Sequence, residues 1–300
     1  MSLTGTRDVE RRMDVAKVTP QSLLAQKQNG AAITALTAYD YPTARLVDEA
    51  GIDVLLVGDS LGMAVLGYED TLSVTMEDML HHARAVRRAV RRALLVVDMP
   101  YGSYQLSVEE TVRNALRLVK EAGSEAVKLE GGASQAVRVR ALAEAEIPVV
   151  GHIGLTPQSL LKMGGYRVQG RSEAAAAQLC EDALALEQAG AVAIVLEGVP
   201  RELAAKITGL LEVPTIGIGA GPDCDGQILV FHDLFSLSFR RPAKFVRSFG
   251  NAEELMRNGL EDFRAAVEAR DFPNDEESYH MPAGVVFELA GTGHNGRGGR

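Results

Sequence analysis

The sequence predicts a (β/α)8 TIM barrel, in which eight parallel strands alternate with helices. Three observations predict it: eight short apolar runs, helix start and stop signals between them, and an alternation that extends over about 250 residues. Short continuous apolar runs are typical of strands that are buried on both faces, as in a parallel sheet. An open doubly wound sheet is the alternative, but it would usually carry a glycine-rich fingerprint after its first strand. The sequence has Thr37-Ala38-Tyr39-Asp40 at that point.

The expected strands are the eight apolar runs, most of them rich in β-branched residues. They are residues 31–37, 54–57, 94–97, 126–129, 149–150, 193–196, 214–218 and 245–246. No linker divides the middle of the chain. We therefore expect a polar lead-in over residues 1–18, a single catalytic barrel over 19–282, and a flexible, glycine-rich tail over 283–300.

Helices are expected between these strands because the sequence carries capping signals. Thr19-Pro20 and Thr156-Pro157 each place a capping threonine before a proline in the first helical turn. Residues 75–78 and 107–110 have the form of a capping box. A glycine follows an alanine where three helices should end, at positions 51, 123 and 190.

The composition excludes several classes of function. The chain has 31 Lys plus Arg against 40 Asp plus Glu, which gives a net charge of −9. This charge argues against binding to nucleic acid or to an anionic membrane. Cys180 and Cys224 provide neither a disulfide framework nor a CxxC zinc pair. There is no apolar run of transmembrane length and no visible signal peptide, so we expect a globular cytoplasmic protein.

Charged residues follow or end five successive strands of the expected barrel. Active sites of such barrels lie at the carboxyl ends of the strands. A single charged residue there is as easily structural, but five strands that deliver charge to one rim are hard to explain by packing, because each buried ion needs a partner. The residues are Asp59, Asp98, Lys128 with Glu130, His152 and Glu197.

These residue types point to metal-assisted proton abstraction. Asp59, Asp98 and Glu130 form an all-oxygen set that suits Mg²⁺ better than zinc. Lys128 provides a cation for a substrate carboxylate or a developing enolate. Glu197 follows an apolar run, which is a suitable setting for a general base. The combination is typical of proton removal next to a carbonyl that a metal polarises, followed by making or breaking a carbon–carbon bond.

Three further segments allow more than one interpretation. The basic helix around Arg84 and Arg87 could bind an anion or nucleic acid, but a solvated outer helix or a subunit contact is favoured. Residues 163–171 form either a lid or a plain exposed loop. The glycines of residues 216–221 could admit a phosphate, or could mark a tight turn, which we favour because no P-loop residues accompany them.

Several motifs together resemble the ketopantoate hydroxymethyltransferase family, in order, from about residue 15 to residue 280. They are residues 57–63, 127–132, 151–159, 164–171, 216–221 and 225–227. The resemblance implies a (β/α)8 barrel of the phosphoenolpyruvate/pyruvate superfamily, often assembled as a decamer. It also implies Mg²⁺-dependent transfer of a one-carbon unit from methylenetetrahydrofolate to α-ketoisovalerate (3-methyl-2-oxobutanoate), which gives ketopantoate for pantothenate and coenzyme A biosynthesis.

The resemblance also assigns roles residue by residue. It makes Asp59, Asp98 and Glu130 metal-site residues, Ser60 and Lys128 contacts of the keto acid, and Glu197 the proton acceptor. Asp59 and Asp98 are expected to lie against the bound substrate as well, and His152 to donate a hydrogen bond nearby. Residues 236–241 differ from the glycine-bearing segment of some family members, and no motif marks the folate site.

Three alternatives differ in chemistry. A lyase of the isocitrate type would carry a cysteine in a Lys-Cys-Gly-His context, which neither Cys180 nor Cys224 has. A Schiff-base aldolase would use Lys128 as the nucleophile. A binding or assembly module without turnover would have no need of the complete set of charged residues.

Overall fold

The structure is a computed structural model that describes residues 16–285. It divides into two compact units, one that extends to Asn251 and one that starts at Ala252. The expected lead-in and tail lie mostly outside the described residues, and the expected barrel boundary at residue 282 stays a prediction. No helix of the described residues is long and apolar enough to cross a membrane.

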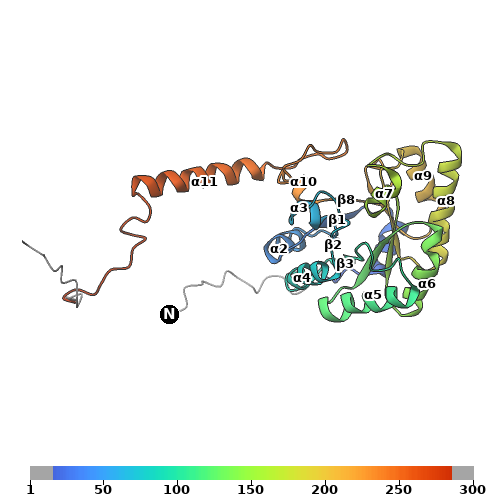
Figure 1. The fold of residues 1–300 in the computed structure, drawn as a ribbon, viewed down its shortest axis with the longest axis horizontal. Helices are drawn as coiled ribbons and strands as arrows, with labels where there is room; N and C mark the ends of the chain where they lie inside the picture. Colours follow the sequence, from blue (N-terminus) through green and yellow to red (C-terminus); the bar gives the residue numbers. More distant parts are fainter. Residues whose placement is uncertain (1–15, 286–300) are drawn as a thin grey trace, which may run out of the picture. The chain divides into compact units, whose positions relative to one another are not determined.

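The first unit is a closed barrel of eight parallel strands in sequence order, with β1 hydrogen-bonded to β8. This confirms the predicted fold class. Figure 1 shows helices around the outside of the strands. The strands are β1 (Ile33–Thr37), β2 (Val54–Val57), β3 (Leu94–Asp98), β4 (Ala126–Glu130), β5 (Val149–Gly154), β6 (Ala193–Glu197), β7 (Thr215–Ile218) and β8 (Gly226–Leu229).

Helices or short helical turns follow most strands of the first unit, and one long helix lies in the described part of the second. The first unit has α1 (Pro20–Gln28), α2 (Tyr41–Glu49), α3 (Leu61–Ala64), α4 (Met76–Arg87), α5 (Val108–Ala122), α6 (Ala136–Glu144), α7 (Leu160–Met163), α8 (Glu173–Gln188), α9 (Arg201–Leu210) and α10 (Phe231–Leu234), with 3-10 turns η1 (Ala133–Gln135) and η2 (Pro157–Ser159). The second unit holds α11 (Ala252–Ala269).

The predicted eighth strand at residues 245–246 is wrong, because Phe245 lies in a turn and Gly226–Leu229 is the last strand. Gly226 is the reason that this short segment can pair on both sides. A Cβ at Gly226 would lie 2.5 Å from the carbonyl oxygen of Ile33. Asp225 fixes the start of β8, since its Oδ2 accepts from the backbone N–H of Thr215 at 2.8 Å. Apolarity alone does not separate the two segments, because Ile228 to Phe231 also form an apolar run; the close backbone approach at Gly226 does.

Most of the predicted caps are present. The Thr19, Thr75 and Ser107 side chains each accept a backbone N–H at the start of their helices. Gly123 ends α5 in the left-handed region at φ 70°, where glycine is favoured. Thr156-Pro157 differs from the prediction, because it opens the 3-10 turn η2 and the Thr156 side chain makes no capping bond.

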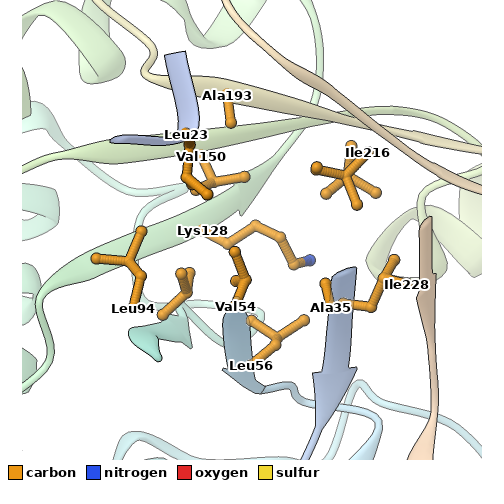
Figure 2. Close-up of a pocket in the computed structure, with 12 residues that line it drawn as sticks. Leu23, Ala35, Val54, Leu56, Leu94, Lys128, Val150, Ala193, Ile216 and Ile228 are labelled. Atoms are coloured by element: carbon orange, nitrogen blue, oxygen red, sulfur yellow. The ribbon is translucent and has the colours of Figure 1, made fainter. Parts of the chain in front are cut away.

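Two apolar layers hold the barrel together. One lies between the strands and the outer helices, and the other fills the barrel interior. Leu23 of α1 belongs to the interior layer and is 2% exposed. The Lys128 side chain lies in the same interior, among side chains such as Val54 and Ile216 (Figure 2). The lysine stem is therefore packed by hydrocarbon, which limits the positions available to its amino group.

The basic helix α4 is an ion-paired outer helix. Arg84 pairs with Glu121 of α5 at 2.7 Å, and Arg87 pairs with Glu125, just beyond the end of α5, at 3.3 Å. These ion pairs join α4 to α5 and to the segment that follows it. These pairs support the favoured interpretation of a solvated outer helix over that of a nucleic-acid site.

Candidate active site

Five successive strands bring the predicted charged residues to one rim of the barrel. Asp59 follows β2 and Asp98 ends β3, while the next three strands carry the remaining members. The strand register places Asp98 beside Lys128 and Glu130 beside His152. Each of these side chains is buried except that of Glu197, which ends β6 and is 16% exposed. A ligand at the rim can therefore reach Glu197 directly.

Polar contacts run without interruption from Asp98 to Glu197. Lys128 Nζ lies 3.0 Å from Asp98 Oδ1 and 3.2 Å from His152 Nδ1. His152 Nδ1 is 3.5 Å from Glu130 Oε1, and its Nε2 is 3.2 Å from Glu197 Oε2. His152 thus stands between two carboxylates, and Lys128 between His152 and Asp98.

Burial and mutual charge shift the pKa values of these groups in different directions. Burial would lower the pKa of Lys128, but Asp98, Glu130 and Asp59 outweigh it and hold the amine charged. Burial and Lys128 would also lower the pKa of His152, but Glu130 and Glu197 raise it to about 9. Burial would raise the pKa of Glu130, yet His152 and Lys128 keep it below its ordinary value.

The pKa of Asp59 shifts in the opposite direction from that of Glu130. Burial, then Asp98 and Glu130, raise the pKa of Asp59 well above its ordinary value. Its carboxylate has no cationic side chain within ion-pair distance among the residues described. The backbone N–H of Asp59 donates to Asp98 Oδ2 at 3.0 Å, which brings the two residues together. Ionised Asp59 is therefore short of a compensating positive charge.

This donor set fits a small, hard divalent cation. Within residues 16–285 no three His, Cys, Asp or Glu side chains converge as a metal-binding group. Mg²⁺ usually takes only one or two carboxylates and keeps several waters, so Asp59 and Asp98 meet its requirement. Gly58 leaves room beside them, since a Cβ there would lie 2.8 Å from Ser60 Oγ and 3.4 Å from Asp98 Oδ2.

The structure adds three neutral residues that sequence reasoning did not select. The hydroxyl of Tyr39 lies 2.8 Å from Ser60 Oγ and fixes this predicted substrate contact. Tyr104 and Gln158 share a 2.6 Å hydrogen bond beneath the carboxylates. Gln158 stood in a recognised motif, residues 151–159, but Tyr39 and Tyr104 gave no chemical signal, because neither carries charge.

The structure shows the surroundings of two segments whose role the sequence left undecided. Gly219 and Gly221 pack tightly: added Cβ atoms would lie 2.5 Å from the Phe245 ring and 2.4 Å from Arg201 Cβ. This close packing favours the tight-turn interpretation of residues 216–221. In the loop after β5, the backbone N–H of Gln169 donates to Gly198 O at 2.9 Å, which ties one end of the loop to the end of β6.

Solved structures of other proteins share this fold. Phosphonopyruvate hydrolase, solved in complex with oxalate and Mg²⁺, superimposes with a TM-score of 0.55 at 16% identity, over 87% of this chain and 93% of that chain. A 2,3-dimethylmalate lyase gives a TM-score of 0.56 at 20% identity, over 83% and 85%. These likenesses show the fold, and together with the charged rim they define a closed barrel of eight parallel strands with buried charged side chains at one end.

Sequence comparison identifies the family. A family profile described as ketopantoate hydroxymethyltransferase matches residues 17–275. A 3-methyl-2-oxobutanoate hydroxymethyltransferase of Koribacter versatilis is 60% identical over 267 residues, 89% of this chain and 90% of that protein. One of Moorella thermoacetica is 54% identical over 264 residues, 88% and 98%. The chain belongs to the ketopantoate hydroxymethyltransferase family, which confirms the resemblance seen in its motifs.

Proposed function

We propose that this enzyme transfers a hydroxymethyl group from methylenetetrahydrofolate to 3-methyl-2-oxobutanoate, giving ketopantoate for pantothenate and coenzyme A biosynthesis. The observation that carries the proposal is the complete set of charged side chains at one rim of a barrel that belongs to this family. A barrel kept only for binding or assembly would not need a buried lysine, a buried histidine and four carboxylates in contact, because each costs desolvation.

Asp59 and Asp98 would hold Mg²⁺, with Glu130 at the same metal site. The lack of a compensating positive charge for ionised Asp59 supports this assignment. When bound, the ion would stabilise negative charge that develops on the keto-acid oxygens. Phosphonopyruvate hydrolase, which shares the fold, was solved with Mg²⁺ and the dicarboxylate oxalate.

Lys128 and Ser60 would bind the keto acid. Lys128 is buried and held charged, so it can attract a carboxylate with little screening by water. The Tyr39 hydroxyl restricts the direction of the Ser60 hydroxyl. Asp59, Asp98 and His152 would complete the walls around the substrate. The folate site has no assigned residues.

Glu197 would remove the proton from C3 of the keto acid. Its side chain is the most accessible of the rim carboxylates that were assigned a role, and its Oε2 lies 3.2 Å from His152 Nε2 in an ion-pair contact. The carbon nucleophile then attacks the one-carbon unit that methylenetetrahydrofolate delivers; water supplies the oxygen of the new hydroxyl group and tetrahydrofolate leaves. Separating proton removal from carbon transfer makes the first step testable without folate.

The test is a pair of measurements on purified protein. With Mg²⁺, 3-methyl-2-oxobutanoate and methylenetetrahydrofolate, the wild type should form ketopantoate. Without folate it should exchange the C3 hydrogen with deuterium from solvent, and Glu197→Gln should slow this exchange by at least about 100-fold, since a general base contributes about 10²–10⁴-fold.

The matched control is Glu202→Gln, the same change at an exposed position of α9, which should exchange at the wild-type rate. Keto-acid affinity should be nearly normal in both variants. Exchange at the wild-type rate in Glu197→Gln would remove the base role from this residue and point to His152.

The proposal extends to assembly and location. We propose a homo-oligomer, following the decamers that the family resemblance implies, and a cytoplasmic location, which the two free cysteines, Cys180 and Cys224, support. We also keep the proposal of a single catalytic barrel over residues 19–282.

A further inference from the structure

We infer that Gln158 is a positioning residue that holds Asp59 and Glu130 ready for the metal. The inference rests on the proposed function, because it concerns the carboxylates assigned there to Mg²⁺. Gln158 lies in η2, directly after β5, and its side chain is turned into the protein, with 6% of the residue exposed. A buried side-chain amide needs hydrogen-bond partners, so the contacts of the Gln158 amide show which groups fix its position.

Gln158 contacts two predicted metal-site carboxylates through different groups. Its side-chain Nε2 donates to Asp59 Oδ2 at 2.8 Å. Its backbone N–H donates to Glu130 Oε2 at 2.9 Å. One residue therefore links the ends of β2 and β4, although it belongs to the segment after β5.

The amide orientation is fixed by its other partners. Nε2 also donates to the carbonyl oxygen of Met99 at 3.0 Å, and a carbonyl can only accept. Oε1 accepts from the Tyr104 hydroxyl at 2.6 Å. If the amide were rotated, two oxygens would face each other at Met99, so the N–H must point to Asp59.

A neutral donor is what this position requires. Among the residues described, the Gln158 amide is the one hydrogen-bond donor to the Asp59 side chain. A lysine or arginine would neutralise Asp59 and remove the charge that attracts a divalent cation. The amide instead fixes Oδ2 without adding positive charge, so a bound metal ion would be the cation that compensates ionised Asp59. Residues that orient a metal ligand in this way typically change metal affinity by about 10–100-fold when they are replaced.

The direct test measures Mg²⁺ binding by calorimetry, without substrate. Gln158→Met keeps the approximate size of the side chain and removes the donor. It should raise the Mg²⁺ dissociation constant by about 10–100-fold. Gln178→Met is the matched control, because Gln178 is exposed on α8 and its Nε2 contacts only Asp182 among the described residues. It should bind Mg²⁺ as the wild type does.

A second measurement separates positioning from general damage. At saturating Mg²⁺, kcat of Gln158→Met should return close to the wild-type value, because the variant loses metal affinity and keeps its reacting groups. A merely structural role would lower kcat at all Mg²⁺ concentrations, together with the thermal midpoint of the metal-free protein. That result would overturn the inference, as would an unchanged Mg²⁺ dissociation constant.

If Gln158→Met does not fold, Tyr104→Phe takes its place. It deletes the hydroxyl that orients the amide and that also accepts the backbone N–H of Glu130 at 3.2 Å, so Mg²⁺ affinity should fall in the same direction and by less, and an unchanged affinity would count against Gln158. The two proposals fail separately. Ketopantoate formation with unaltered Mg²⁺ binding in the variants removes the positioning role alone, whereas weakened binding without ketopantoate formation in the wild type removes the proposed reaction alone.

Discussion

At the scale of single residues, Lys128 decides which chemistry the rim can perform. A lysine that forms a Schiff base must present an uncharged amine, which usually requires a lowered pKa. Here Asp98, Glu130 and Asp59 outweigh burial and hold the amine charged. Lys128 is therefore suited to attract an anion and poorly suited to attack a carbonyl, so borohydride in the presence of keto acid should not trap it.

His152 should titrate far from the ordinary histidine value of about 6.5. Glu130 and Glu197 overcome burial and Lys128 and raise its pKa to about 9. A raised folded-state pKa means that the ion pairs of His152 stabilise the fold fully below about pH 6.5, and that this contribution is lost as the pH rises through about 9.

The measurement is the NMR titration of labelled histidine side chains, with His152→Gln to assign the signal. An apparent pKa near 9 is expected for the metal-free protein. A value at or below 6.5 would contradict it, and would mean that Lys128 donates to an unprotonated Nδ1 across their 3.2 Å contact.

The two aspartates should separate metal binding from stability. Asp59→Ala and Asp98→Ala should both lose Mg²⁺-dependent activity. Burial raises the pKa of both carboxyl groups, but their metal-free stabilities should differ, because Asp98 pairs with Lys128 at 3.0 Å and Asp59 has no such partner among the described residues. Removing one partner of a buried pair costs about 3–5 kcal/mol, so Asp98→Ala should unfold at lower denaturant concentration and Asp59→Ala should not.

Denaturant titration in chelator-treated buffer measures the stabilities of the two variants. The ketopantoate assay with and without Mg²⁺ measures their Mg²⁺-dependent activity. Wild-type turnover of both variants in metal-free buffer would show that these residues do not bind the catalytic metal.

Charged site residues could be predicted from the sequence, whereas neutral ones could not. Asp59, Lys128 and Glu197 stand out because burying an ion at a strand end is costly without a purpose. Gln158 and Tyr104 carry no such cost in the sequence. Their importance depends on the hydrogen bond between them, which joins residues 54 positions apart. A pattern of neighbouring residues in the sequence cannot reveal such a contact.

At the scale of elements, seven of the eight strands lie where apolar runs predict them, within a few residues. Most residues of those strands are buried, apart from the exposed Thr34 of β1, so apolarity is largely a consequence of their position. β8 differs because two of its four residues, Gly226 and Gln227, are not apolar. Close backbone approach selects glycine at the start of β8, and its apolar half, Ile228 and Leu229, continues into Val230 and Phe231, so apolarity marks this segment at least as well as residues 245–246.

Replacing Gly226 should test this account of β8. In Gly226→Ala the new Cβ would meet the carbonyl oxygen of Ile33 at 2.5 Å, so β1 and β8 must separate. Overpacking of this kind typically costs about 1–3 kcal/mol in the free energy of unfolding. Gly209→Ala is the control, because an added Cβ on helix α9 meets nothing within 4 Å. It should stabilise by roughly 0.5–1 kcal/mol. Equal effects of the two changes, measured by urea unfolding, would contradict the account.

At the scale of the whole molecule, α11 supports the proposed self-association. None of its residues is buried, and four apolar side chains, Met256, Leu260, Phe263 and Val267, fall on one helical face and are 45–69% exposed. Within its own unit no described residue buries this stripe, and an apolar stripe of this kind is typical of a surface that packs against another protein surface. In the proposed homo-oligomer a second copy of this chain would supply that surface.

Light scattering should therefore give a mass well above the 32.1 kDa of one chain. Leu260→Glu combined with Phe263→Glu should lower the assembled mass, because charge on the stripe opposes its burial. Asn258→Glu on the opposite helical face should leave the mass unchanged. A 32.1 kDa species for the wild type across a wide concentration range would exclude self-association.

Closure of the barrel also determines when the chain can finish folding during its synthesis. β1 pairs with β8, and the Thr37 hydroxyl accepts the N–H of Phe231, 194 residues later. At about 5–20 residues per second, a ribosome needs roughly 10–40 s to make that stretch. Throughout this time one edge of β1 has no native partner, and an unpaired edge can pair with other chains. The nascent polypeptide therefore has a long window in which a chaperone that shields β1 would raise the yield of native enzyme.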